Sequence, residues 1–598
     1  MKVFMKLSWF FKQEKFKYLF GLIVLLGIAL ISLIPPQIIG KTIDAIASER
    51  LTGRQLLMYM LLLAGAAVMV YILRYTWRVL IFGTSNKLGR ILRNRLYEKY
   101  TSMSPSFFQR RRTGDLMAHA TNDINAIQGA AGPGVLMIGD SMITGTSILV
   151  TMAITINWKL TLIVMLPLPV LVILSSYYGR LMSKGFKKAQ AAFSRLNDKT
   201  QESIAGIKVT KTMGYEKSDQ KDFKRISDDV VKKNLKVAQI DALFDPTIML
   251  VIGTSYFLAL VFGSFMIFNN TITLGQLITT TTYLGMLVWP LLALGFFFNV
   301  IQRGHASYER ISDILEAENE IDLSYKVEGY PSGTIRFQIE SFTFPDAEQP
   351  ALKNVCFTIE EGMTVGIVGR TSSGKSTLLR LLVREFDTQR PEDITYGKRP
   401  LRDYEIKHLR AMFGYVPQDN FLFSTTIREN IAFAQPDVSD QQVKQAAELS
   451  DIHQDIIHFP KGYDTIVGER GVSLSGGQKQ RVSIARAVIN NPPVLIFDDS
   501  LSAVDAATEE QILSNMHHDR QGKTNIITAH RMSAVSHADL IIVMEDGTVA
   551  EQGTHEQLMH NQGWYYQTYQ SQQLREQLTK DLDQAAREEG DDPHGETT

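Results

Sequence analysis

The chain has 598 residues, with 62 Lys+Arg, 62 Asp+Glu, 45% hydrophobic residues and a single cysteine, Cys356. Zero net charge gives no reason to expect a nucleic-acid partner, one cysteine excludes a disulfide framework or a thiolate zinc site, and the composition excludes disordered and fibrous classes. The apolar residues gather in roughly the first half of the chain as long runs with few charges. This division predicts a membrane-embedded half followed by a soluble half.

Residues 1–16 do not resemble a cleaved signal peptide. The apolar run that follows them is too long for a signal-peptide core, and it ends in Pro35-Pro36 without a small-residue cleavage site. Trp9, Phe10 and Phe11 lie among lysines, which predicts a helix in the membrane interface.

The membrane half, residues 17–310, is predicted to cross the membrane six times, because a span needs about 20 apolar residues. No Asp, Glu, Lys or Arg lies between Asp245 and Arg303. The alternative is buried core helices of a large soluble protein, and several uncharged runs of this length in one half of a chain argue against it. The predicted spans are residues 17–39, 56–82, 132–156, 160–180, 246–268 and 274–301.

Basic residues concentrate in two long polar segments, 83–131 and 181–245, whereas the loops after the third and fifth spans carry only Lys159. The positive-inside rule therefore places both termini and both long segments in the cytoplasm. Both segments are rich in helix formers, so they are predicted to continue the spans into the cytoplasm at ~1.5 Å per residue. Residues 107–115 are the predicted tip of the first segment, and the second tip is expected near 202–206.

Two intramembrane features leave alternatives open. Asp140 and Arg74 lie at similar depths in their spans, so they could form a structural ion pair, or Asp140 could interact with cationic substrates. Met286, Trp289 and Phe296 to Phe298 could line an apolar binding cavity, or they could serve helix packing and lipid contact.

The soluble half is predicted to comprise a charged linker over 311–335, an α/β domain over 336–570 and a polar tail over 571–598 that begins as a frayed helix and becomes disordered. A β-rich run, 364–368, leads directly into Gly369-Arg-Thr-Ser-Ser-Gly-Lys-Ser376. This is the phosphate-binding pattern G-x-x-x-x-G-K-[ST] in its strand–loop–helix context. Lys375 is expected to bind the β- and γ-phosphates, and the Ser376 hydroxyl to bind Mg²⁺.

Two further motifs follow downstream. The apolar strand 494–497 ends in Asp498-Asp499, where a carboxylate can hold Mg²⁺ opposite the serine of the phosphate loop. Between the two lies Leu474-Ser-Gly-Gly-Gln478, whose backbone N–H groups and hydroxyl can bind a second anion at a helix start. This sequence is not expected to reach the nucleotide on its own loop.

In order and spacing, residues 369–376, Gln418, 474–478, Asp498, 502–505 and His530 resemble the ATPase domain of ABC transporters. Six spans ahead of such a domain resemble a half-transporter of the exporter type. Residues 107–116 look most like the BmrC-type half of bacterial heterodimeric multidrug exporters. The resemblance implies a six-helix transmembrane domain followed by an α/β P-loop ATPase, with ATP and Mg²⁺ as cofactors, in the plasma membrane of a bacterium.

The resemblance also implies roles for individual residues. Gln418 would sense Mg²⁺, His530 would contact the γ-phosphate, Asp505 would communicate across a dimer interface, and Glu469 would read the partner's coupling helix. Metal contacts would come from Ser376, Gln418 and Asp498. Nucleotide contacts would come from Phe344 (adenine stacking), Gly369, Ser372, Gly374, Lys375, Ser376 and Thr377, and from Ser475, Gly477 and Gln478 toward ATP held by a second subunit.

One position departs from the family pattern. The family's general base is a Glu directly after the Mg²⁺ carboxylate, and this chain has Asp499. Since a ~1 Å misplacement can cost on the order of 10²-fold in rate, we expect the chain's own site to bind ATP but hydrolyse it slowly. Its Leu474–Gln478 sequence would then complete the fast site of a partner that keeps the Glu.

The resemblance implies alternating access driven by ATP, with apolar or amphipathic, often cationic, drug-like compounds as substrates. Three alternatives stay open. Asp499 could support turnover in a homodimer, the substrate could be a lipid or peptide, or the chain could be mainly a regulatory ATP-binding subunit.

Overall fold

The computed structural model describes residues 2–468 and 474–590 and divides into two compact units. The first unit comprises residues 1–102 and 111–317. The second comprises residues 103–110 and 318–598. The tip of the first predicted cytoplasmic segment therefore folds with the C-terminal part of the chain.

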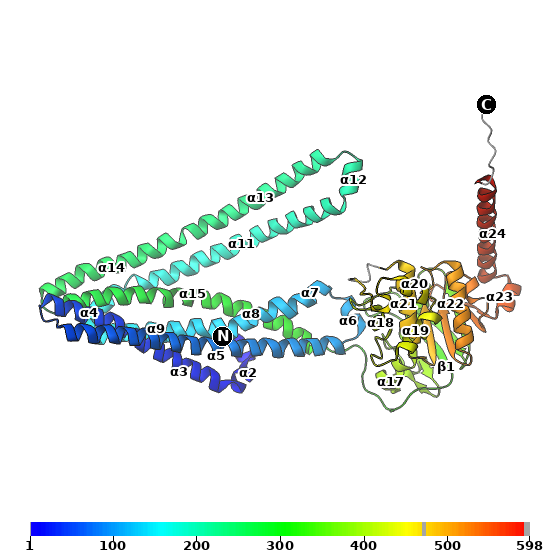
Figure 1. Ribbon diagram of the computed structural model, residues 1–598, viewed down its shortest axis with the longest axis horizontal. Coiled ribbons are helices and arrows are strands. Elements are labelled where there is room, and N and C mark those ends of the chain that lie inside the picture. The colour runs from blue at the N-terminus through cyan, green and yellow to red at the C-terminus, as the bar shows by residue number, and fades with distance from the viewer. Residues whose placement is uncertain (1, 469–473, 591–598) are drawn as a thin grey trace. The chain divides into compact units, whose positions relative to one another are not determined.

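The described residues of the first unit form helices and no strands (Figure 1). Three short π-helical stretches, His119–Asp123, Ala130–Gly134 and Ala153–Asn157, interrupt them. The helices are α1 (Lys2–Lys6), α2 (Ser8–Gln13), α3 (Lys15–Ser32), α4 (Ile34–Ala47), α5 (Gly53–Ser102), α7 (Thr113–Ala118), α8 (Ile124–Gly129), α9 (Val135–Met152), α10 (Trp158–Met165), α11 (Leu168–Ala205), α12 (Ile207–Thr212), α13 (Glu216–Ala242), α14 (Phe244–Phe268) and α15 (Leu274–Glu316).

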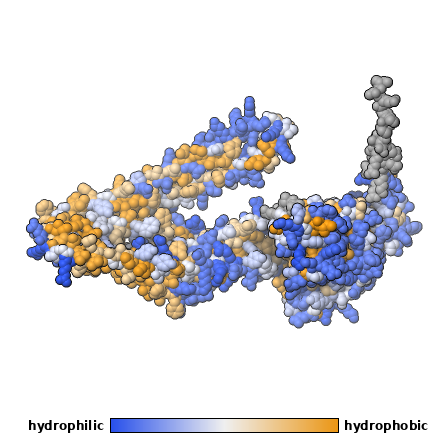
Figure 2. All heavy atoms as spheres, in the orientation of Figure 1, coloured by the Kyte–Doolittle hydropathy of each residue, from blue (hydrophilic) through white to orange (hydrophobic). Residues whose placement is uncertain are grey.

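Among the described residues, five helical stretches are long and apolar enough to cross a membrane: Lys15–Ala47, Gly53–Ser102, Thr113–Met165, Glu216–Phe268 and Leu274–Glu316. Figure 2 shows apolar side chains covering much of this unit. The predicted fourth span, 160–180, is divided between α10 and α11, which Leu166 and Pro167 separate. The chain turns into it at Asn157, whose side chain accepts hydrogen bonds from the backbone N–H groups that start α10.

The prediction that the long polar segments continue the spans is confirmed. Helix α5 runs for 50 residues, about 75 Å at 1.5 Å per residue. Helices α11 and α13 lie side by side as a hairpin, with α12 at its turn (Figure 1). The second tip therefore lies at α12, just beyond the expected residues 202–206. Helix α15 likewise reaches into the predicted linker, because the buried Ile311 and Ile314 continue its apolar face.

A buried polar cluster joins the π-helical stretch His119–Asp123 to α15. The Asp123 carboxylate accepts hydrogen bonds from Ser307 Oγ (2.8 Å) and Arg310 Nε (3.0 Å). His119 Nδ1 lies 2.7 Å from the same carboxylate. A buried carboxylate is tolerated when its oxygens are paired in this way, so the cluster fixes the start of the third helical stretch against the last helix.

The second unit contains two sheets. The antiparallel sheet has the order β2-β1-β4-β5, and the larger sheet has the order β10-β9-β3-β8-β7-β6, parallel except for β10. The strands are β1 (Ile335–Phe342), β2 (Leu352–Ile359), β3 (Thr364–Gly369), β4 (Ile394–Tyr396), β5 (Arg399–Pro400), β6 (Phe413–Val416), β7 (Val494–Asp498), β8 (Thr524–Thr528), β9 (Leu540–Glu545) and β10 (Thr548–Gly553).

Helices cover the larger sheet, as expected for a parallel sheet whose strands are buried on both faces. Strand β7 is buried at all five positions. The helices of this unit are α6 (Pro105–Gln109), α16 (Lys375–Leu382), α17 (Ile406–Ala411), α18 (Ile427–Ile431), α19 (Asp440–Leu449), α20 (His453–His458), α21 (Gly476–Val488), α22 (Ala506–Asp519), α23 (His555–Asn561) and α24 (Trp564–Gly590). The predicted polar tail is helical through α24, and residues 591–598 lie outside the described part.

Candidate nucleotide site

The phosphate loop runs from the end of β3 into α16, and its backbone requires glycine at two points. Gly369 has φ +148° and Gly374 φ +103°, and Ser372 between them also has a positive φ, +65°. A Cβ on Gly369 would lie 2.2 Å from the carbonyl oxygen of Met544, and one on Gly374 would lie 2.7 Å from Leu352 Cδ2. A loop held in this conformation can turn successive N–H groups toward an anion.

Lys375, the first residue of α16, is buried. Its Nζ donates hydrogen bonds to the carbonyl oxygens of Gly369 and Arg370, both at 2.9 Å. Burial lowers the pKa of Lys375, and the carboxylates of Asp499 and Asp498 oppose that shift. The ammonium therefore lies over the loop where phosphates would bind, and Thr377 follows it on the same helix.

Two of the three predicted metal ligands, Ser376 and Asp498, meet in the structure, whereas the third, Gln418, is hydrogen-bonded to Asp499. Ser376 Oγ donates to Asp498 Oδ1 at 2.8 Å. A hydroxyl and a carboxylate at this separation are the hard oxygen ligands that Mg²⁺ takes beside phosphates. Ser373 Oγ, in the same loop, is buried without a hydrogen-bond partner among the described residues. The residues thus fit a Mg²⁺-nucleotide, whose metal would neutralise phosphate charge during transfer.

Two residues of this site were not predicted from the sequence. Tyr415 of β6 donates its hydroxyl hydrogen to Asp498 Oδ2 at 2.8 Å, and Thr528 of β8 donates to Asp498 Oδ1 at 3.2 Å. Burial raises the pKa of Tyr415, and the Asp498 carboxylate raises it further. Both strands flank β7, so polar residues near the carboxyl ends of neighbouring strands were the signal that could have identified them.

The three residues expected to act in hydrolysis also lie together. Gln418 Nε2 donates to Asp499 Oδ2 at 3.2 Å, and His530 Nε2 lies 3.5 Å from the same oxygen. Burial raises the pKa of Asp499, while His530 and Lys375 oppose the shift. The Asp499 backbone is in the left-handed region, φ +47°, and its N–H donates to Thr528 Oγ1 at 2.7 Å. The carboxylate is therefore held at a fixed point beside the metal ligands.

The second anion-binding motif caps a helix. Ser475 is the N-cap of α21: its Oγ accepts from the Gln478 N–H, and the Gln478 side chain accepts from the Ser475 N–H. Gln478 Nε2 also donates to Asp455 Oδ1 at 2.8 Å. Gly477 lies half-buried in the first turn of this helix. Asp505 is the N-cap of α22, and its side chain accepts a hydrogen bond from the Thr508 N–H at 3.0 Å. Glu469 lies outside the described residues.

Phe344, the expected adenine-stacking residue, is half-buried in the loop between β1 and β2. Its ring packs edge-on against Phe342 and Phe386, both with centroids 5.1 Å away. The Arg380 guanidinium lies 5.8 Å from its centroid. Two rings and a cation hold the side chain at the edge of the phosphate-loop helix, which leaves part of it free for stacking.

The intramembrane pair considered above does not form in the described structure. Asp140 accepts a hydrogen bond from Thr144 Oγ1 at 2.9 Å on its own helix, and Arg74 is exposed on α5. An apolar cavity of about 390 Å³ does lie among α9, α10, α11 and α15. None of the five aromatic and Met residues suggested for a cavity lines it. Its lining residues are Leu149, Met165, Leu168, Pro169, Val172, Ile173, Leu287 and Leu291.

Comparison with known families gives two matches along the chain. The sequence pattern described as ABC transporter transmembrane region matches residues 18–291, and the pattern described as ABC transporter matches residues 352–502. Together they account for both the helical unit and the phosphate loop with its downstream carboxylates.

Similar proteins include two bacterial sequences and one solved structure. The chain is 43% identical over 573 residues to the probable multidrug resistance ABC transporter ATP-binding/permease protein YheI of Bacillus subtilis (strain 168), covering 96% of this chain and 98% of that protein. It is 44% identical over 578 residues to the multidrug resistance-like ATP-binding protein MdlA of Escherichia coli (strain K12), covering 97% and 98%. A bacterial Atm1-family ABC exporter with ATP bound is 25% identical and superposes with a TM-score of 0.79, covering 93% and 99%.

Proposed function

The chain belongs to the ABC transporter family as an exporter with a transmembrane region and a fused ATPase domain, and from this premise we propose that it is one half of a heterodimer whose own ATP site is hydrolytically impaired. The expected partner is a second half-transporter, of the kind that pairs with BmrC-type subunits, with Glu after its Mg²⁺ carboxylate. The observation that carries the proposal is Asp499, which stands where the family has a longer carboxylate and is held there by its backbone.

The hairpin of α11 and α13 supports the proposal that the chain binds a partner protein. Around α12 the apolar side chains of Ile204, Val209 and Met213 are 68%, 65% and 75% exposed. A cluster of exposed apolar residues at a hairpin tip marks a protein interface. Ser475 also supports a partner protein. It is exposed at the start of α21, and its side-chain hydrogen bond lies within its own helix. Ser475 and Gly477 are thus available for the phosphates of ATP bound to a second subunit.

The proposed transport cycle is alternating access at the bacterial plasma membrane, with both termini and the ATPase domain in the cytoplasm. ATP shared between two ATPase domains favours their closed arrangement, and the helical extensions α5, α11 and α13 carry that closure to the membrane. A nucleotide shifts this equilibrium only by its difference in affinity for the two states. Hydrolysis at the partner's site then removes the γ-phosphate contacts and resets the dimer.

Apolar or amphipathic drug-like compounds are the proposed substrates. The names of YheI and MdlA refer to multidrug resistance. The cavity among α9, α10, α11 and α15 is lined by apolar side chains alone and has a volume in the range of small-molecule sites. A lipid with a single apolar chain would suit the same cavity, so the homodimeric lipid exporter is the second candidate.

The test begins with gentle purification of the tagged chain from its native membrane. A second half-transporter at equal stoichiometry, with Glu after its Mg²⁺ carboxylate, is expected. Changing that Glu to Gln should then abolish most ATP turnover. Recovery of this chain alone as an active dimer would refute the asymmetric pairing, and so would retention of most activity in the Glu→Gln complex. ATP binding without turnover in any complex would instead favour the regulatory subunit.

A further inference from the structure

Arg110, at the end of α6, joins three segments that are far apart in the sequence. Its Nε donates to Asp346 Oδ2 at 2.6 Å, and its Nη1 pairs with Glu320 Oε1. Ser106 of α6 donates to the other Glu320 oxygen at 2.6 Å. One guanidinium thus connects the tip of the first cytoplasmic segment, the residues that follow α15, and the loop between β1 and β2.

Asp346 belongs to the turn that holds Phe344. The Ala347 N–H donates to the Phe344 carbonyl oxygen at 2.9 Å, and the Ala351 N–H donates to the Phe342 carbonyl oxygen at 2.7 Å. Asp346 therefore lies inside a closed turn that begins at Phe344. A displacement of its carboxylate would move the backbone from which the Phe344 ring projects.

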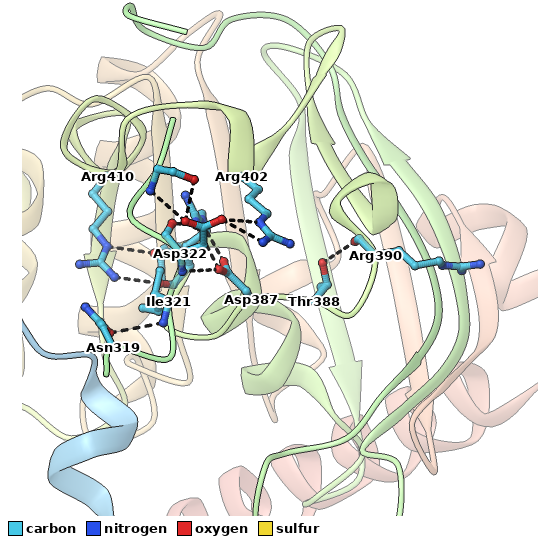
Figure 3. Close-up of polar contacts among 11 residues, drawn as sticks. Asn319, Ile321, Asp322, Asp387, Thr388, Arg390, Arg402 and Arg410 are labelled. Atoms are coloured by element: carbon cyan, nitrogen blue, oxygen red, sulfur yellow. Dashed lines mark hydrogen bonds and ion pairs between the residues drawn. The ribbon is translucent and has the colours of Figure 1, made fainter. Parts of the chain in front are cut away.

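Glu320 provides a fixed point on the other side of Arg110. Two residues later, Asp322 accepts from Arg402 Nη2 at 2.9 Å, and its N–H donates to Asp387 Oδ2 at 3.0 Å (Figure 3). Hydrogen bonds from Ser324 and from Arg402 lower the pKa of Asp322, so its carboxylate is charged at neutral pH. The segment that carries Glu320 is thereby fastened to the body of the ATPase domain.

We propose that Arg110 is a positioning residue for nucleotide binding, which holds the Phe344 turn through Asp346 while Glu320 and Ser106 hold Arg110. This rests on the proposed site, in which Phe344 stacks on adenine. Helices α5 and α7 adjoin α6 in the chain on either side. A movement of these membrane-derived helices therefore reaches the base-binding residue through one side chain, as well as through the main chain.

An ordinary surface ion pair is the alternative. The side chains of Arg110 and Glu320 are each 35% exposed and Asp346 is 71% exposed, and isolated pairs at such positions contribute little. Arg110 differs because its planar fork binds two carboxylates at once, which lysine cannot reproduce. The two readings differ in what they predict for nucleotide binding, since a surface pair has no reason to act on the base.

The experiment measures equilibrium binding of ATP with Mg²⁺ to the purified full-length chain in nanodiscs. We expect Arg110→Ala to raise the Kd for ATP about three- to tenfold, as for the loss of one or two weak ion pairs. Arg110→Lys should give a smaller increase. The matched control is Arg112→Ala, an exposed arginine two positions along, which should leave the Kd unchanged.

Two further measurements separate positioning from structural damage. Inorganic tripolyphosphate has no base, so its binding should be the same in Arg110→Ala and in the parent chain. Arg110→Ala should also add nothing in a Phe344→Ala background, because the ring through which it acts is gone.

Equal weakening of tripolyphosphate and ATP would overturn the proposal, as would additive effects of the two substitutions or an unchanged Kd in Arg110→Ala alone. If Phe344→Ala itself leaves ATP binding unchanged, the adenine assignment fails, and that outcome is distinguishable because it does not involve Arg110.

Discussion

Lengthening Asp499 to Glu should restore fast hydrolysis at the chain's own site. The Asp499 carboxylate reaches Gln418 at 3.2 Å and His530 at 3.5 Å. Its backbone cannot advance to replace a missing methylene, because the N–H is bonded to Thr528 and φ is +47°. If the carboxylate stands ~1 Å short of the attacking water, the cost is on the order of 10²-fold, or about 2.7 kcal/mol of barrier.

The assay is phosphate release from the complex in which the partner's Glu is already changed to Gln, so that only this site turns over. Asp499→Glu should raise the rate about 10- to 100-fold. The gain will fall toward the lower value if Glu is strained at the positive φ, which can cost about 1 kcal/mol. Asp499→Asn is the control and should lower the residual rate further, because an amide cannot accept a proton from the attacking water. An unchanged or slower rate in Asp499→Glu, with ATP binding intact, would refute the distance argument.

The raised pKa of Asp499 also predicts how residual ATP turnover depends on pH. Burial raises the pKa of Asp499 above that of an ordinary carboxyl, and only the ionised form can accept a proton from water. The residual turnover of the parent site should therefore decline, as pH falls, at a higher pH than an exposed carboxylate would give. A profile of Asp499→Asn that declines in the same range would assign the effect to another group.

Three other substitutions test the site and the fold. Gly374→Ala should weaken ATP binding about 10- to 100-fold in a direct binding assay, because φ +103° costs a residue with a Cβ about 1–3 kcal/mol and the added atom would lie 2.7 Å from Leu352 Cδ2. Tyr415→Phe should raise the Mg²⁺ concentration for half-maximal ATP binding about fivefold, as for one lost hydrogen bond to Asp498; an unchanged Mg²⁺ titration would contradict this. Asp123→Ala should destabilise the protein by about 2 kcal/mol, since it removes the acceptor for Arg310 and a buried hydroxyl; thermal unfolding in detergent measures it, and an unchanged Tm would count against the cluster.

The phosphate loop could be predicted from sequence because its requirements are local. Gly369 to Ser376 form one strand–loop–helix unit, so spacing alone locates the lysine and the hydroxyl. Tyr415 and Thr528 could not be found in the same way. They reach Asp498 from β6 and β8, which only the strand order brings beside β7.

In the membrane half, too, local features could be predicted from the sequence and contacts between helices could not. Hydrophobic run length predicted where the helices lie. The similar depths of Asp140 and Arg74, however, did not mean that the two residues form an ion pair. Depth along a helix says nothing about rotation around its axis, and Arg74 is exposed on α5 while Asp140 bonds to its own helix. Run length also could not show that the fourth span is broken near Pro167.

Binding and hydrolysis depend on different atoms in this site, and this separation makes the proposed asymmetry physically coherent. The groups proposed to hold Mg²⁺-ATP are all in place and mutually bonded or buried: Lys375, Ser376 and Asp498. The one altered group, Asp499, is proposed to act on the attacking water rather than on the nucleotide. On that proposal, a carboxylate one methylene shorter would raise the barrier to hydrolysis without weakening the closed state. ATP in this chain's site would then persist through several cycles, while a partner's site, completed by Ser475 and Gly477, sets the frequency of opening.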